Sequence, residues 1–181
     1  MRHNGPVIDR LRIHRDQLRT VLHPGEEPRA LQAATYVDGE EDLGQPRPDV
    51  LAELADTALL WHSAYFQGLA DRLVSGRSLL GWPGCDAQTL AHAVGQHDLV
   101  VTDRRMLVVD LGDSSRPARL VWERDRMHIV RIRRMPRPFQ AGRIWIVMAD
   151  GSAVSLMLGV VSAAGAKRVV EAWGEVPGSA R

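Results

Sequence analysis

Residues 99–111, LVVTDRRMLVVDL, decide the fold class of this chain of 181 residues. Two runs rich in Val and Leu, at 99–102 and 106–111, flank the polar residues Asp103, Arg104 and Arg105. Short β-branched and aliphatic runs joined by a few polar residues are typical of an antiparallel hairpin. The sequence therefore predicts that two strands pair here through a tight turn.

Similar β-branched and aliphatic runs continue downstream of the hairpin. Further strands are predicted at 119–122, 128–134, 143–149 and 153–158. The last two flank Asp150–Gly151, the strongest two-residue hairpin signal in the sequence. Alternation in 128–134 predicts that Arg131 and Arg133 share one face with Ile129, and that Arg134 shares the other with Val130 and Ile132. Ser162 then precedes a predicted amphipathic helix that ends near Trp173.

The region before the hairpin instead shows residue patterns that are typical of helices. Pro6 and the leucine spacing predict an amphipathic helix at 7–22, stopped by Pro24–Gly25. Residues 29–37 suit a strand or a short helix, the acidic segment 38–49 suits a loop, and 49–74 suits one long or two short helices. A glycine-rich break at 75–84 precedes a helix that Asp86 is expected to cap and that runs to Val94. Helices followed by an antiparallel meander and a closing helix indicate the α+β class.

Composition bounds the function classes. The chain carries 23 basic and 22 acidic residues, a net charge of +1, which argues against a strongly basic nucleic-acid coat protein. The charges are nevertheless segregated, because residues 116–143 hold nine arginines against Glu123 and Asp125 alone. The single cysteine, Cys85, excludes an internal disulfide. Neither a long apolar run nor a signal peptide is evident, so we expect a cytoplasmic protein.

The hairpin also carries a resemblance. TDRRM at 102–106 resembles the Thr-Asp/Asn-Arg-Arg-Leu hairpin of bacterial pleckstrin-homology-like (PH-like) and GRAM-like domains, with Met106 in place of Leu. The downstream meander and the helix ending at Trp173 are similar to that family's second sheet and C-terminal helix, and residues 23–27, HPGEE, resemble its entry segment.

The resemblance implies an antiparallel β-sandwich or partial barrel with a C-terminal capping helix, spanning 25–176. The N-terminal helix at 1–24 would precede it, and a helical insertion would occupy about 47–97. Such domains usually bind lipids, peptides or proteins. Phosphoinositide-binding members place basic residues in the first strand–strand loop, where this chain reads DGEED at 38–42, a segment that would repel phosphate.

Arginines are the candidate binding residues. Those singled out lie in the predicted strand 128–134, just after it and in the first hairpin turn: Arg104, Arg105, Arg131, Arg133, Arg134 and Arg137. Arginine forms paired hydrogen bonds to phosphate and carboxylate groups, so the set could hold an anionic ligand. The alternatives are a solvated strand face or salt bridges to the acidic segment 38–56, which would then mask the arginines.

No pattern in the sequence indicates catalysis, a metal or a cofactor. The spacings of His62, Cys85, His92 and His97 fit no zinc template, and neither nucleotide-binding glycine motif occurs. Cys85 lacks an identifiable His or Asp partner for nucleophilic chemistry.

The leading expectation is therefore a non-enzymatic PH-like module that binds a protein or an anionic ligand. One alternative is peripheral binding to anionic lipid headgroups through the arginines and helix 7–22, and another is a small enzyme of unknown class. A second copy of the chain is a further candidate partner, whereas nucleic acid is disfavoured.

Overall fold

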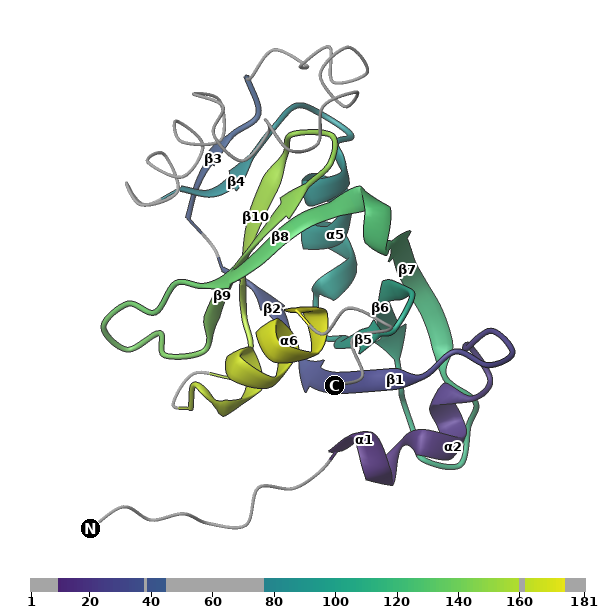
Figure 1. Ribbon diagram of the computed structural model, residues 1–181. Helices are drawn as coiled ribbons and strands as arrows, with labels where there is room; N and C mark the ends of the chain where they lie inside the picture. Colours follow the sequence, from purple (N-terminus) through teal and green to yellow (C-terminus); the bar gives the residue numbers. More distant parts are fainter. Residues whose placement is uncertain (1–9, 38, 45–76, 160–161, 175–181) are drawn as a thin grey trace, which may run out of the picture.

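Strands in two open sheets dominate the computed structural model, which describes residues 10–37, 39–44, 77–159 and 162–174 (Figure 1). Sheet A has the order β1 (Pro28–Ala33), β5 (Asp98–Thr102), β6 (Arg105–Asp110) and β7 (Arg119–Asp125). Sheet B has the order β3 (Glu40–Asp42), β4 (Arg77–Leu80), β10 (Ala153–Met157), β9 (Arg143–Met148) and β8 (Ile129–Arg134). The short β2 (Thr35–Tyr36) pairs with β10 beside β4. All pairings are antiparallel except that of β3 with β4.

Helices in the described residues lie at the sheet ends and on one outer face. They are α1 (Arg10–Ile13), α2 (Arg15–Leu18), α5 (Asp86–Val94), α6 (Ala164–Gly174) and the 3₁₀ turn η3 (Arg126–His128). The first turn of α5 is capped from the β9–β10 turn, because the Asp150 carboxylate accepts from the Asp86 amide at 2.8 Å and the Ser152 hydroxyl accepts from the Ala87 amide at 3.1 Å. Gly95 ends the helix with a φ of +32°, in the left-handed region that glycine tolerates.

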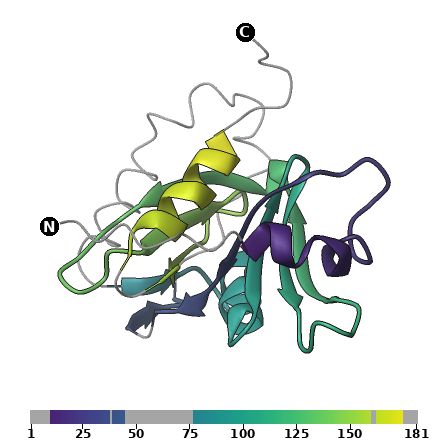
Figure 2. The same ribbon diagram turned by 90° about the horizontal axis from the view of Figure 1, so that it is seen from below.

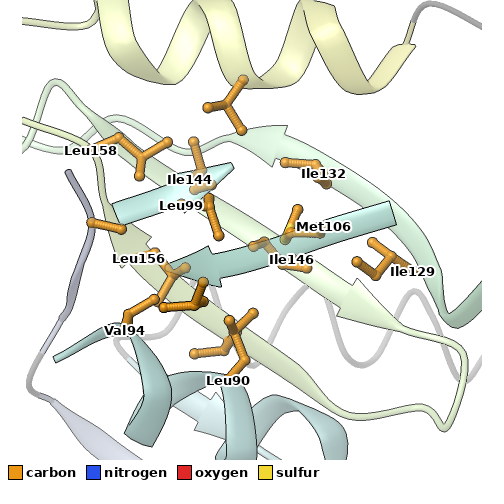
Figure 3. Close-up of a cluster of buried hydrophobic side chains, with 14 of the residues drawn as sticks. Leu90, Val94, Leu99, Met106, Ile129, Ile132, Ile144, Ile146, Leu156 and Leu158 are labelled. Atoms are coloured by element: carbon orange, nitrogen blue, oxygen red, sulfur yellow. The ribbon is translucent and has the colours of Figure 1, made fainter. Parts of the chain in front are cut away.

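One main core lies between the two sheets, and α5 and α6 close it from opposite sides (Figure 3). Leu90 and Val94 of α5, Leu99 and Met106 of sheet A, and Ile146 of sheet B are all fully buried in it. Because β5 and β6 are buried on both faces, their sequences read as continuous apolar runs rather than as alternation.

The second face of sheet A is covered by the N-terminal helices. Leu18 of α2 packs with Val100, Leu107 and Val109 in a separate apolar cluster. Arg10 of α1 forms a two-pronged ion pair with Asp98, at 2.6 and 3.1 Å, and so fixes α1 beside β5.

The α+β class and most of the elements from Asp86 onward are confirmed. The hairpin at 99–111, the strands after it, the Asp150–Gly151 turn, α5 and α6 all form close to their predicted bounds. Asp86, however, is the first residue of α5 rather than its cap, since its carboxylate binds Arg124 instead. The two mostly antiparallel sheets are open and do not form a closed barrel.

Three local predictions were wrong. Residues 7–22 do not form one helix in their described part, because a turn at His14 separates α1 from α2. The loop expected at 38–49 contains β3, and the break expected at 75–84 contains β4. These two strands pair with each other, and β4 also pairs with β10, a nonlocal contact that no local pattern reports. The helices predicted at 49–74 lie outside the described residues. Among the helices that the structure describes, none is long and apolar enough to cross a membrane.

Candidate functional site

Arginine-rich sequence and an absence of carboxylates mark the hairpin formed by β8, β9 and the loop between them. From Arg126 to Ala149 the chain contains six arginines and neither Asp nor Glu. In both views the β8–β9 loop projects beyond the body of the molecule (Figures 1 and 2). We call residues 129–148 the arginine hairpin.

A β-bulge sets which arginines share a face. Ile129 pairs with Met148 and Arg131 with Val147, so the register shifts at Val130. Ile129 and Ile132 therefore both point into the core, which corrects the predicted grouping of Ile129 with the arginines. Arg131 and Arg133 do share a face, as predicted, opposite Val147 and Trp145 of β9.

Arg131 and Arg133 are close enough to influence each other electrically. Burial lowers the pKa of the Arg131 guanidinium, and the positive charge of Arg133 lowers it further. Like charges held close together on a strand repel, and an anion between them would relieve that repulsion. Arg133 and Arg134 are both exposed, and within the described residues neither has a carboxylate partner.

At its far end the arginine hairpin closes in a β-turn built on Pro138 and Phe139. The Gln140 amide donates to the Arg137 carbonyl at 2.9 Å, and Phe139 has a φ of +62°. Proline at the second position and a positive φ at the third are the marks of a type II turn, which normally takes glycine at that third position. Phe139 is the only non-glycine residue with positive φ in the described chain, and its side chain is 94% exposed.

Arg143 stands at the base of the hairpin and is almost wholly buried, with 2% exposure. Its guanidinium donates to Gln140 Oε1 and Ser155 Oγ, both at 3.1 Å, and its Nε has no hydrogen-bond partner. Burial lowers the pKa of Arg143, and the charge of Arg137 lowers it further. Buried guanidinium groups normally face a carboxylate, but none of the described carboxylates pairs with this one, so it adds positive potential to the hairpin.

The structure places the other two candidates elsewhere. Arg104 lies at the β5–β6 turn, exposed, and donates to the carbonyls of Pro24 and Gly25 at 3.4 and 3.2 Å. Arg105 is 2% exposed and is bound by the carboxylates of Glu26 and Glu123. Both therefore tie the segment at 23–27 to sheet A. The other four candidates, Arg131, Arg133, Arg134 and Arg137, all lie on the arginine hairpin, where Arg134 is paired with Ile144 and so faces the other side of the strand from Arg131 and Arg133.

Ion pairs within the fold also occupy the arginines of β7. Arg119 binds Asp110 at 3.0 Å, and Arg124 binds Asp86 at 2.7 Å. Arg126, just after β7, lies over the Trp173 ring, 4.2 Å from its centroid. Of the nine arginines at 116–143, five lie in the arginine hairpin, and Arg116, Arg119, Arg124 and Arg126 lie before it.

The described acidic residues do not mask these arginines. Glu40, Glu41 and Asp42 form β3, at the opposite edge of sheet B from β8. Asp42 binds Arg77 at 2.7 Å, and Glu41 accepts a hydrogen bond from the Tyr36 hydroxyl at 2.9 Å. The masking hypothesis is therefore wrong for this part of the segment 38–56.

Sequence reasoning missed two residues of the site. Arg143 enters the sequence analysis only through the charge count. Its burial follows from its place on β9, a strand whose residues are buried on both faces. Phe139 is not among the candidate residues that the sequence predicts. The Pro-Arg-Pro-Phe order at 136–139 contained a turn signal, because proline favours the second position of such turns.

Within the described ranges, no group of three or more His, Cys, Asp or Glu side chains could hold a metal ion. Comparisons with protein-family models, curated proteins and solved structures find no match to the chain.

Proposed function

We propose that this chain is a non-enzymatic interaction module of PH-like organisation that binds an anionic group through the arginine hairpin. Two mostly antiparallel sheets with a C-terminal helix against the core support the PH-like organisation. The anionic ligand class rests on the chemistry of the hairpin rather than on that organisation.

A single observation carries the proposal. Arg133 and Arg134 are exposed and have no carboxylate partner among the described residues, and the hairpin that carries them has no acidic residue and has buried Arg143 at its base. By contrast, Arg119 and Arg124 of β7 each form an ion pair with a carboxylate. An anion that approaches the hairpin therefore meets the guanidinium donors of Arg133 and Arg134, which no carboxylate of the described residues occupies.

The test compares two double variants of equal charge change on a heparin column, with heparin as the polyanionic probe. R133E/R134E reverses the hairpin charges, and R116E/R119E reverses two exposed arginines near β7 in sheet A. We expect R133E/R134E to elute at a clearly lower salt concentration than the parent protein, and R116E/R119E to elute close to it. Equal shifts for both variants would show a general charge effect and overturn the proposal.

A further inference from the structure

The Phe139 turn has a conformation that stability alone does not favour. A bulky residue at a positive φ is strained, and glycine would form the same turn without strain. The ring is 94% exposed, so packing against the described residues does not compensate for the strain. Strain combined with exposure of a large apolar group indicates a role outside the folded chain.

The surroundings of the ring favour a particular kind of partner. Pro136 and Pro138 are also exposed, so the loop presents a small convex apolar tip. Arg133 and Arg134 lie where β8 leads into the loop, and no carboxylate interrupts the segment. A protruding ring with a belt of arginines complements the interface of an anionic bilayer, where aromatic rings lie at headgroup depth and guanidinium groups meet lipid phosphates. A protein partner would more typically use a broader apolar patch.

On these grounds we propose that the tip of the arginine hairpin inserts Phe139 into the interface of anionic membranes, with Arg133 and Arg134 on the headgroups. The inference rests on the proposed anion-binding function and adds the lipid surface as the anion's source. It assigns membrane contact to this hairpin instead of to the N-terminal helices, whose Leu18 is buried against sheet A. Neither signal alone holds a protein firmly at a membrane, so the ring and the arginines act together.

The first experiment measures co-sedimentation of the full chain with vesicles of phosphatidylcholine, with or without about one third phosphatidylserine. We expect binding only to the anionic vesicles, and its loss at high salt. F139S should lower the partition coefficient roughly tenfold, as expected for a ring that leaves a mostly apolar environment, while its elution from heparin stays unchanged. M127S is the matched control, because Met127 is 79% exposed at the other end of β8, and it should bind as the parent does.

Two further variants separate this role from a structural one. F139W should retain vesicle binding, because tryptophan also prefers the interface. F139G should weaken vesicle binding while the melting temperature stays equal or rises, because glycine relieves the positive φ. A structural role for the ring would instead lower the melting temperature.

Direct contact can be read from an environment-sensitive fluorophore on F139C, with M127C as its counterpart. Cys85 is 2% exposed, so labelling selects the introduced thiol. A blue shift with anionic vesicles at position 139 alone supports insertion. The insertion is overturned if the protein does not bind anionic vesicles at low salt, or if F139S binds them as well as the parent does. If the parent protein still binds heparin in that case, the proposed anion-binding function stands, and its partner would be a protein. If R133E/R134E and R116E/R119E weakened heparin binding equally, the proposed anion-binding function itself would be overturned.

Discussion

Glu26 and Arg105 form a deeply buried ion pair, with side chains 0% and 2% exposed. The Glu26 carboxylate accepts hydrogen bonds from Arg105 Nε at 2.9 Å, Arg105 Nη2 at 2.8 Å, Thr102 Oγ1 at 2.7 Å and the His23 amide at 2.9 Å. Burial alone would raise the pKa of Glu26, but the hydrogen bonds from Arg105, His23 and Thr102 outweigh it and hold the pKa at about 2. This pair fixes the chain entering β1 to the β5–β6 turn.

E26Q should lower the free energy of unfolding by about 3 kcal/mol, because it leaves the buried Arg105 without its main counter-charge. E123Q provides the matched comparison: Glu123 binds the same guanidinium but is 47% exposed, so its loss should cost less than about 1 kcal/mol. Urea denaturation at neutral pH measures both. Equal losses would show that the buried bonds of Glu26 contribute nothing beyond those of a surface pair.

The same residue predicts a pH dependence. The pKa of the Glu26 carboxyl is lower in the folded state than its ordinary value of 4.5, so at pH values above 4.5 its ionisation stabilises the folded state. This stabilisation is lost as the pH falls toward 2. We therefore expect the parent protein to lose about 3 kcal/mol more than E26Q between pH 5 and pH 2. Parallel stability curves for the two proteins would contradict the lowered pKa.

At the scale of elements, Gln17 of α2 ties the N-terminal helices to the loop after β6. Its side-chain amide donates toward the carbonyls of Leu111, Asp113 and Arg116, at 2.9, 3.0 and 2.8 Å. Residues 111–117 have few other internal bonds, so this one side chain supplies the partners that a strand would otherwise provide.

Q17A should therefore destabilise the protein by about 2 kcal/mol, since the buried Leu111 carbonyl and the partly buried carbonyls of Asp113 and Arg116 lose their donor. Hydrogen exchange should accelerate most in 111–118 and in α2. D16A changes the neighbouring residue, whose side chain is 90% exposed, and should stay within about 0.5 kcal/mol of the parent. Faster exchange spread evenly over both sheets in Q17A would exclude a local tie.

Elements with strong local patterns were predictable, and those fixed by distant partners were not. The β5–β6 hairpin and α5 follow from apolar runs and from Gly95, which their own residues supply. β3 reads as an acidic loop because only its pairing with β4 makes Glu40–Asp42 a strand. The bulge at Val130 likewise depends on the register with β9, and it moves Ile129 to the core.

The candidate site followed the same division. Composition identified the arginines at 131–137 as a group, since strand alternation and charge counts are local properties. It could not separate Arg105 from them, because its burial depends on Glu26, a residue 79 positions away. The exposure of Phe139 is also a property of the assembled hairpin, visible only once both strands are paired.

For the whole molecule, sheet B separates charge across its width. Acidic β3 forms one edge and arginine-rich β8 the other, with three strands between them. A net charge of +1 therefore coexists with a positive edge that is able to orient the protein toward an anionic surface. Because the opposing charges are far apart, salt should weaken this orientation at long range before it weakens direct contacts.

The main core joins both sheets and both long helices, so the described fold should unfold as one unit. Leu90 of α5 is fully buried among residues of sheet A and sheet B. L90A should lower the free energy of unfolding by about 3 kcal/mol, through lost apolar contact and the cavity left behind. Native-state hydrogen exchange should then show the same loss of protection in β5 and in β9, because opening either sheet exposes the shared core. L120A, at a residue 37% exposed on β7, should cost less than about 1 kcal/mol. A loss confined to β9 in L90A would mean that the two sheets open independently and that the core does not couple them.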